Sequence, residues 1–422
     1  MPEESILTDD FLRELMNVGE VDILVGVPTF NDAKTVAPVV QAIRAGLLKY
    51  FPRQRAVIIN ADGGSKDPTQ ELVRAASITD MVRAANIHAL RTLHCISTQY
   101  AGGAASGTAL HTIVAAADLL RARACAVISA DSLSITPEWL EGLLRPVHRE
   151  SFDLVTPLYR RHKFDGLLVR NLVYPMTRAV YAKRIREPHP PDFAFSGRLA
   201  GHFLGEEIWT QDIARTGAEM FLTVSAITGG FSVAQSYLGP KARVEHSSSD
   251  LVPAMRQTVG GLFWSLDPNF AFWSAQNGSQ AVPTFGADYE IALEPLRVNR
   301  KHLHQMFVRG VADLEPVLKT ILSASTLAEL QRVAALPEDD FCYSDELWVR
   351  TVYDLAAAHH KTVISRDHIV QALAPLYRGK TYTFLAQNRE APAEELERNV
   401  ESLSQTFERM KPYLLEQWNG QK

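Results

Sequence analysis

Asp131 is the acidic residue whose surroundings best suit it for chemistry. It follows an apolar segment in the stretch 127–139, VISADSLSITPEW, at the point where apolar residues give way to polar ones. A strand that is apolar throughout is buried on both faces of an open α/β sheet, so the residues beyond its carboxyl end lie where ligands bind. A carboxylate there can hold a divalent metal ion against a diphosphate. The alternative is that Asp131 caps the helix predicted to begin near Pro137.

A first strand-to-helix turn, GVPTFNDAKT at 26–35, carries polar side chains at the same predicted edge of the sheet. The carboxyl ends of parallel strands meet at one edge, so we expect this turn to lie beside Asp131. A nucleotide base and ribose can dock there. The candidate residues are Pro28, Thr29, Asn31 and Asp32.

Two glycine-containing segments complete the edge. The second strand ends in Asp62-Gly63-Gly64, whose glycines permit close backbone approach and whose carboxylate can accept a hydrogen bond from a base N–H. The segment QYAGGAASGTALHT at 99–112 opens a predicted helix near Ser106 and Gly107, and its free N–H groups can face phosphate oxygens. It is not a P-loop, because no G-K-[ST] follows the glycines, and the first turn lacks the dinucleotide pattern G-x-G-x-x-G.

The elements that position these turns alternate in type. Short apolar runs predict strands at 21–27, 56–59, 126–129 and 153–157. The helices between them are predicted to begin near residues 36, 68 and 137 and to span 106–120. Repeated strand-helix-strand units indicate right-handed crossovers and a mostly parallel α/β sheet flanked by helices. Residues 160–250 read as loops, with one further strand at 231–238.

The remainder of the chain is predicted to be helical. We expect a catalytic domain at 1–260 and a helical C-terminal domain at 261–422 that contributes to an acceptor site, to oligomerisation or to both. In the last predicted helix an apolar stripe runs from Leu396 to Leu414. It is either a coiled-coil seam of a homodimer or the buried face of a helix packed on its own domain, and Pro412 disfavours a long regular coil.

The composition restricts the class of protein. The 422 residues are 46% hydrophobic and 22% charged, with a formal net charge of −5, which does not favour nucleic-acid binding. The cysteines Cys95, Cys125 and Cys342 are far apart and read as reduced thiols of a cytosolic protein. No signal peptide pattern begins the chain, and no apolar run approaches the ~20 residues of a membrane span.

Taken in order, these loops resemble the nucleotide-binding half of GT-A glycosyltransferases. The closer resemblance is to the retaining glucosylglycerate and mannosylglycerate synthases and the glucosyl-phosphoglycerate synthases. Their motifs P-x-x-N-E/D, D-G-S-x-D-x-T, K-G-x-x-A-L-R and D-x-D followed by P-x-W are similar to 28–32, 62–69, 106–111 and 129–139 here. The resemblance covers roughly residues 20–260 and implies a GT-A fold, a nucleoside diphosphate sugar donor and Mg²⁺ or Mn²⁺.

The resemblance also implies roles for residues further along. Asp192, in REPHPPDF, would lie near the donor sugar hydroxyls, and Trp209 and Asp212, in WTQD, would line the sugar and acceptor pocket. In GPKARVEHSSSDL, Lys241 and Arg243 would face the diphosphate, and His246 would complete a metal site with Asp131. In the family the leaving phosphate oxygen is thought to accept the acceptor's proton, which makes the two aspartates positioning groups rather than nucleophiles.

Three positions depart from the family pattern, and each loses a charge. Ser129 replaces the first aspartate of D-x-D, Ser106 replaces the lysine of the helix start, and His111 replaces its arginine. His246 also lies a few residues beyond the family spacing. Lys241 or Arg243 could supply positive charge directly to the diphosphate and so reduce the dependence on metal. Alternatively, these two are solvated loop charges.

The expected reaction is retaining transfer of glucose, or of mannose, to D-glycerate or a similar small hydroxy acid. Two basic clusters could bind the carboxylate of this acceptor, or could be ordinary surface charge. A different hypothesis is a degenerate domain that binds a nucleotide sugar as a sensor or partner module, and another is a transferase for a polysaccharide or lipid-linked acceptor. The acceptor candidates are Tyr159 and Arg160 in one cluster and Arg378 and Lys380 in the other, and His111, His189 and His202 fall near the predicted site.

Overall fold

The structure is a computed structural model that describes residues 7–77, 91–96, 106–210, 214–241, 251–288 and 299–420. The chain forms two compact units. The first comprises Met1–Arg160, Glu187–Val244 and Val282–Ile291, and the second comprises Arg161–Arg186, Glu245–Ala281 and Ala292–Lys422. This division differs from the predicted one, which placed a single domain boundary at residue 260. Each unit contains several separate segments of the chain.

The first unit is built on one eight-stranded sheet with the order β10-β8-β5-β7-β4-β1-β2-β3. All neighbouring strands pair in parallel except β7, which is antiparallel to both β4 and β5. The strands are β1 (Ile23–Thr29), β2 (Ala56–Asp62), β3 (Arg91–Ile96), β4 (Ala124–Val127), β5 (Leu154–Arg160), β7 (Phe193–Ser196), β8 (Val233–Pro240) and β10 (Thr284–Phe285). The predicted class, a mostly parallel α/β sheet flanked by helices, is confirmed.

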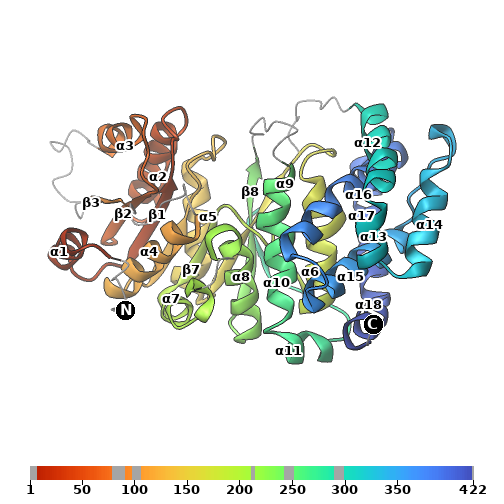
Figure 1. The fold of residues 1–422 in the computed structure, drawn as a ribbon. Helices are drawn as coiled ribbons and strands as arrows, with labels where there is room; N and C mark the ends of the chain where they lie inside the picture. Colours follow the sequence, from red (N-terminus) through yellow and green to blue (C-terminus); the bar gives the residue numbers. More distant parts are fainter. Residues whose placement is uncertain are drawn as a thin grey trace. The chain divides into compact units, whose positions relative to one another are not determined.

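Helices cover both faces of this sheet (Figure 1). On one face α2 packs against α3 and α5, and on the other α4 packs against α7 and α8. Apolar residues of β1 and β4 meet α2 and α5 in a core where Trp139 is almost fully buried. The helices are α1 (Asp9–Val18), α2 (Val36–Tyr50), α3 (Thr69–Ser77), α4 (Ser106–Leu119), α5 (Pro137–Glu150), α7 (Gly197–Leu204) and α8 (Ala214–Thr228), with a 3-10 helix at Glu207–Thr210.

Strand β7 lies in a region that the sequence predicted to be loop. It is four residues long, FAFS, and its first residue Phe193 pairs with Val127, the last residue of β4. Short apolar runs are hard to recognise without a longer periodic pattern. This strand is important for the site, because it brings Asp192 to the carboxyl end of β4.

The second unit is helical apart from a two-stranded pair, β6 (Lys183–Arg184) with β9 (Gln280–Ala281). Its shorter helices are α6 (Tyr174–Tyr181), α9 (Leu251–Met255), α10 (Gly261–Leu266) and α11 (Phe270–Ala275), with π-helical turns at Val169–Val173 and Arg256–Gly260 and a 3-10 turn at Glu338–Asp340. The others are α12 (Arg300–Asp313), α13 (Glu315–Ile321), α14 (Ala324–Ala334), α15 (Asp345–Lys361), α16 (Arg366–Gln387), α17 (Ala393–Arg409) and α18 (Lys411–Asn419).

The apolar stripe of the last predicted helix is divided between α17 and α18. The helix is interrupted at Met410, which ends α17 and precedes α18. Pro412 occupies the first turn of α18, where its missing N–H would have had no partner within the helix. The stripe is buried within the second unit, where α17 packs against α6, α15 and α18. The interpretation as a coiled-coil dimer seam is therefore wrong, because the side chains that would form it are already covered.

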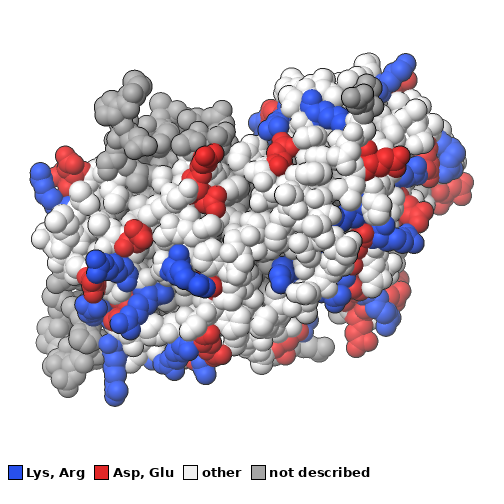
Figure 2. Space-filling view, turned by 90° about the horizontal axis from the view of Figure 1, so that it is seen from below, with Lys and Arg blue, Asp and Glu red and all other residues white. Residues whose placement is uncertain are grey.

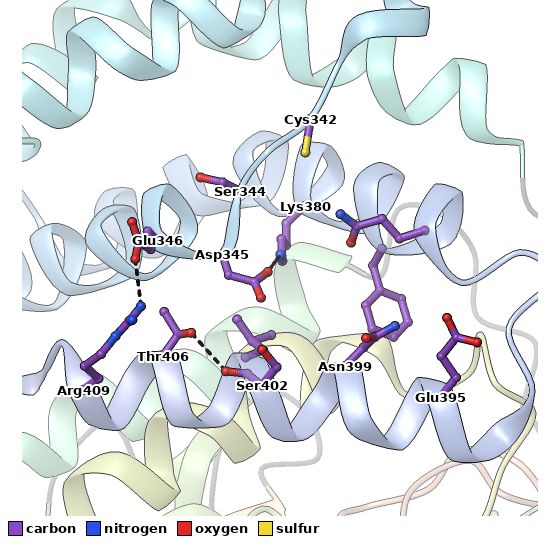
Figure 3. Close-up of a pocket in the computed structure, with 13 residues that line it drawn as sticks. Cys342, Ser344, Asp345, Glu346, Lys380, Glu395, Asn399, Ser402, Thr406 and Arg409 are labelled. Atoms are coloured by element: carbon purple, nitrogen blue, oxygen red, sulfur yellow. Dashed lines mark hydrogen bonds and ion pairs between the residues drawn. The ribbon is translucent and has the colours of Figure 1, made fainter.

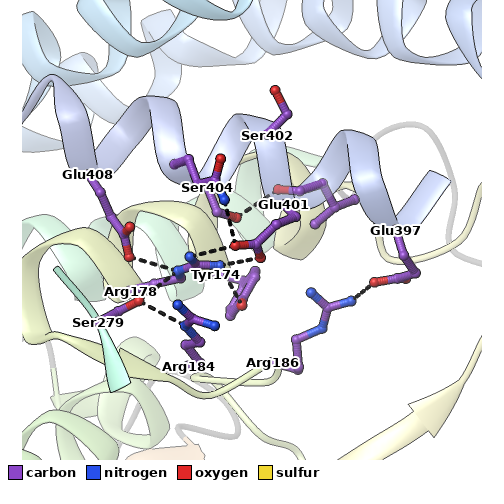
Figure 4. A network of polar contacts seen from close by, with 12 residues as sticks. Tyr174, Arg178, Arg184, Arg186, Ser279, Glu397, Glu401, Ser402, Ser404 and Glu408 are labelled. Atoms are coloured by element: carbon purple, nitrogen blue, oxygen red, sulfur yellow. Dashed lines mark hydrogen bonds and ion pairs between the residues drawn. The ribbon is translucent and has the colours of Figure 1, made fainter. Parts of the chain in front are cut away.

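Helix α17 is held to α6 by the buried guanidinium of Arg178 (Figure 4). Its side chain is 1% exposed and donates to both oxygens of Glu401, at 2.5 and 2.8 Å, and to Glu408 at 2.8 Å. The hydroxyl oxygens of Tyr174 and Ser279 accept its remaining hydrogen bonds. The Arg178 hydrogen bond lowers the pKa of Glu401 to about 2. A buried charge must be paired in this way or it opposes folding.

Charged side chains on the surface are mixed in sign. Figure 2 shows basic and acidic groups lying close together on the face in view. At the amino ends of β1 and β4, for example, Arg121 pairs with Glu20 at 3.1 Å and Arg123 with Asp22 at 3.8 Å. Within the described ranges, none of the helices combines the length and the apolar character that a membrane span requires.

Replacing Arg178 by Met should lower the free energy of unfolding by about 3–5 kcal/mol, because Glu401 and Glu408 would lose their buried partner. Urea denaturation measures this change. The control is Arg309→Met, since Arg309 pairs with Asp313 while both side chains are mostly exposed, and it should cost less than about 1 kcal/mol. Equal costs for the two variants would contradict the assignment of Arg178 as the link between α6 and α17.

Candidate functional site

An ion pair between Asp192 and Lys241 lies at the carboxyl end of the sheet. The Lys241 ammonium is 2.8 Å from Oδ2 of Asp192, a carboxylate that is fully buried, and the lysine side chain is 11% exposed. Lys241 follows β8, and its position beside the rings of Trp139 and Tyr159 adds cation-π contacts at 5.4 and 4.9 Å. The two charges therefore compensate each other inside the first unit.

The same carboxylate fixes the loop that follows β4. The backbone N–H of Ser129 donates to Oδ1 of Asp192 at 2.9 Å, and the hydroxyl of Ser132 donates to both oxygens, at 2.8 and 3.0 Å. The Tyr159 hydroxyl donates to Oδ2, and Lys241 donates to Ser132 Oγ at 2.7 Å. Asp192 thus receives hydrogen bonds from three segments, so the loop from Ser129 to Ser132 has a defined conformation.

Asp131 is presented by this loop. Its carboxylate is half-buried and, among the residues that the structure describes, receives one hydrogen bond, from the Ser129 hydroxyl at 2.6 Å. The residue that caps α5 is Thr136 rather than Asp131. The capping alternative is therefore wrong, and the remaining oxygen lone pairs of Asp131 can serve a ligand.

The turns after β1 and β2 are joined by side-chain hydrogen bonds. The Asn31 N–H donates to Ser65 Oγ at 2.8 Å, and Asn31 Oδ1 accepts from the Lys66 N–H at 2.9 Å. The Asp32 N–H donates to Thr69 Oγ1 at 2.8 Å. Asn31 has a φ of +57°, in the left-handed region that asparagine tolerates. The two turns therefore form one rigid surface, with Pro28 and Thr29 at its base on β1.

Asp62 organises this surface from within. Its carboxylate is fully buried and accepts five hydrogen bonds, from the Thr29, Ser65 and Gln70 side chains and from two backbone N–H groups, at 2.6 to 3.0 Å. Burial alone would raise the pKa of Asp62, but these hydrogen bonds outweigh it and lower the pKa below its ordinary value. The Asp62 oxygens that were predicted to accept a hydrogen bond from a base N–H already accept hydrogen bonds from the protein itself. Any role of Asp62 in donor binding would act through the loop that it holds.

Negative charge gathers at this edge of the sheet. Burial, together with the carboxylates of Asp131, Asp67 and Asp62, raises the pKa of Asp32, although the Phe30 N–H donates to it at 2.7 Å. Carboxylates that repel one another in this way fit an oxygen-seeking cation such as Mg²⁺ or Mn²⁺. Within the described ranges there is no complete group of three His, Cys, Asp or Glu ligands.

A stacked pair of rings joins α4 to the 3-10 helix. His111 lies 4.3 Å from Trp209 between ring centroids, with 6° between the ring planes, and the Trp209 indole N–H donates to the Phe203 carbonyl at 2.5 Å. Burial lowers the pKa of His111 to about 4, so this imidazole is neutral at pH 7. Helix α4, which carries His111, begins at Ser106, followed by Gly107, as predicted.

The other histidines expected near the site are engaged with acidic residues. Nε2 of His202 is 3.0 Å from both Ser225 Oγ and Glu206 Oε1. His189 lies 3.4 Å from Glu219. Burial opposes the charged form of His189, but the neighbouring Glu219 carboxylate outweighs it and raises the pKa of His189. These contacts account for both histidines as packing groups of the first unit.

The acceptor candidates belong to different units. Tyr159 and Arg160 end β5 in the first unit, where the Tyr159 hydroxyl is directed to Asp192 and Arg160 pairs with Asp288 at 2.5 Å. Arg378 and Lys380 lie on α16 of the second unit, and Lys380 pairs with Asp345. A further group of predicted site residues lies outside the described residues: Asp212, Arg243 and His246.

Several residues that build the site were not predicted from the sequence. Ser132 is fully buried and bridges Asp192 to Lys241, while Ser65 and Gln70 hold Asp62. The Gln70 side chain, from the first turn of α3, donates to Asp62 Oδ2 at 2.9 Å. Just before α3, the Asp67 carboxylate accepts from the Thr69 N–H at 3.1 Å. Apolar periodicity gives no signal for such side-chain hydrogen bonds.

Comparisons with known proteins give structural matches only. No family model matches the sequence, and no curated protein matches it. The solved structures that are similar include glucosyl-3-phosphoglycerate synthase from Mycobacterium tuberculosis with Mg²⁺ and UDP, at 19% identity and a TM-score of 0.44, over 63% of this chain and 84% of that chain. The same enzyme with Mn²⁺, UDP and glucosyl-3-phosphoglycerate matches at 20% identity and a TM-score of 0.43, over 63% and 85%.

Both matches are distant. At such identities and TM-scores the likeness concerns the fold, and nothing about substrate or mechanism follows from it. The role of each site residue must therefore be argued from the geometry of this chain.

Replacing Lys241 by Met should lower the free energy of unfolding by about 3–5 kcal/mol, because a fully buried carboxylate would lose its counter-charge. Chemical denaturation measures the change. The double variant Asp192→Leu/Lys241→Met removes both charges and should recover part of this loss. Lys49→Met is the control, since Lys49 pairs with Glu138 with both side chains about half exposed, and it should cost much less than Lys241→Met. A Lys241 cost as small as the Lys49 cost would refute the buried pair.

The stability of the protein should depend on His111 between pH 6.5 and 4. The folded state holds the pKa of His111 near 4, below the ordinary value of 6.5. On acidification the unfolded chain therefore takes up this proton first, and stability falls as the pH drops through this window. His111→Phe keeps a stacking ring but cannot titrate. Its melting temperature should fall less than that of the parent protein from pH 7 to pH 4.5, and equal falls would contradict the assignment.

Proposed function

We propose that this protein is a nucleotide-sugar-dependent glycosyltransferase that uses the carboxyl edge of the first unit's sheet. The observation that carries the proposal is the loop from Ser129 to Ser132, which is fixed by the buried Asp192–Lys241 pair and presents the half-buried Asp131 carboxylate beside Asp32. A rigid turn surface adjoins this acidic group. Binding sites that act on a diphosphate need a firmly held cation position of this kind.

Metal dependence is part of the proposal. Lys241, which was expected to face the diphosphate, donates to Asp192 and Ser132, so its charge is already compensated within the fold. A diphosphate approaching Asp131 and Asp32 would meet negative charge. Mg²⁺ or Mn²⁺, bound at Asp131, would neutralise that repulsion and stabilise the charge of the leaving diphosphate. We therefore expect activity to be lost in EDTA.

The finer proposal is retaining transfer of glucose, or of mannose, to a small hydroxy acid. Asp192 is buried and accepts hydrogen bonds from the chain through both oxygens, which disfavours a role as nucleophile and favours a positioning role through the loop. The neighbouring structures contain UDP, and one contains glucosyl-3-phosphoglycerate, so UDP-glucose is the first donor and D-glycerate and 3-phosphoglycerate are the first acceptors to test.

A second candidate function is binding of a nucleotide sugar without turnover. It is favoured by Ser129, whose hydroxyl stands where the resembled family has a carboxylate and donates to Asp131 at 2.6 Å. One carboxylate fewer weakens the hold on a divalent cation. Saturable binding without product from any donor would favour this alternative.

The test is product formation from UDP-, GDP- and ADP-glucose and GDP-mannose with each acceptor, in Mg²⁺, Mn²⁺ or EDTA. We expect one donor to give product only with metal. Asp131→Asn should lower turnover by about 100-fold or more, because it weakens the one firmly presented metal ligand. Asp339→Asn, on an exposed 3-10 turn of the second unit, is the matched control and should leave turnover unchanged. Full activity of Asp131→Asn, or activity in EDTA, would contradict the proposal.

A further inference from the structure

The second unit contains a polar pocket of about 610 Å³ between the segment that precedes α15, helix α16 and helix α17 (Figure 3). This volume is within the range of about 300–1,000 Å³ that small-molecule sites occupy. All residues that line it belong to the second unit, so the pocket is formed without any contribution from the candidate transferase site.

The charges that line the pocket are arranged in pairs. Lys380 from α16 donates to Asp345 at the start of α15, and Arg409 from α17 donates to Glu346 at 2.7 Å. Figure 3 shows both pairs bridging between elements. Glu395 adds one more negative charge to the lining, which leaves an excess of acid over base. A carboxylate or phosphate ligand is therefore disfavoured, because each cation is already matched and the surplus charge is negative.

Lys380 is more deeply buried than a lysine in a helical unit usually is. Its side chain is 2% exposed, and Asp345 is its one hydrogen-bond partner among the residues that the structure describes. An ammonium group carries three donors. Burying them costs free energy unless they are satisfied, so a ligand with acceptor oxygens in this pocket would complete the hydrogen bonding of Lys380.

The remaining lining mixes neutral donors and acceptors with a small apolar surface. Hydroxyls of Ser402 and Thr406 and the amides of Gln387 and Asn399 surround the pocket, and the ring of Phe384 contributes to its wall. Sugar hydroxyls both donate and accept hydrogen bonds, and a sugar ring also has an apolar C–H face. A lining of paired charges, amides, hydroxyls and one aromatic ring complements these groups.

We propose that this pocket binds a small neutral polyhydroxylated molecule, a sugar or a polyol. The proposal does not rest on transferase activity, since none of the residues that line the pocket belongs to the candidate transferase site. Cys342 gives a local readout, because its exposed free thiol lines the same pocket while Cys125 is buried in the sheet.

The experiment measures the rate at which a maleimide modifies Cys342 in the full chain, followed by mass spectrometry that identifies the modified cysteine. The probes are D-glucose, D-mannose, maltose and glycerol, with D-glycerate and inorganic phosphate as charged counterparts. At least one neutral probe should slow the modification of Cys342 saturably, by about threefold or more, and the charged probes should not. No protection by any neutral probe, or protection by the charged probes alone, would overturn the proposal.

Two variants tie the protection to the pocket. Ser402→Tyr places a ring in the pocket from an exposed position on α17 and should abolish protection, whereas the matched Ser325→Tyr on the surface of α14 should retain it. If Ser402→Tyr does not fold, Gln387→Leu, which removes an exposed lining amide, should weaken protection instead. Protection that persists undiminished in the folded pocket variant would refute the proposal. Loss of transferase activity has no bearing on this result, so the two proposals fail independently.

Discussion

The candidate site depends on one buried charge pair, Asp192 with Lys241. Two opposite charges can be removed from water only when they are close and their other hydrogen-bonding positions are satisfied. Here that requirement brings together the loop after β4, the end of β5 and the end of β8, because Ser129, Ser132 and Tyr159 all donate to the same carboxylate. The antiparallel strand β7 makes this possible by delivering Asp192 between β4 and β5. The conformation of the Asp131 loop follows from these constraints.

This arrangement also determines which groups remain for chemistry. Lys241 and Asp62 are used to build the site, whereas the charge of Asp131 is close enough to Asp32 to help raise the pKa of Asp32. Cation-assisted binding of a diphosphate is the chemistry that this distribution favours. The neutral His111, stacked on Trp209, adds an apolar surface in the same unit rather than a charge.

Much of this unit could be predicted from the sequence, because buried parallel strands and the helices between them carry periodic apolar patterns. The strands at β1, β2, β4, β5 and β8 and the start of α4 at Ser106 were found this way, with boundaries displaced by a few residues. Strand β7 was missed, because four residues show no period. The partners of Asp62 and Asp192 were also missed, because apolar periodicity does not specify which carboxylate accepts from Ser65, Gln70 or Ser132. The apolar stripe of α17 likewise did not reveal that its partner is α6 of the same chain.

The most direct test of the account is a crystal structure of the protein with UDP and Mn²⁺, with diffraction data collected at the manganese absorption edge. The account predicts an anomalous peak within coordination distance of Asp131 Oδ2, and a diphosphate on the side of that ion away from the sheet. It also predicts that the Asp192–Lys241 pair remains intact when the ligand is bound. A manganese peak elsewhere, or UDP bound away from the carboxyl edge of the sheet, would contradict the assignment of this site.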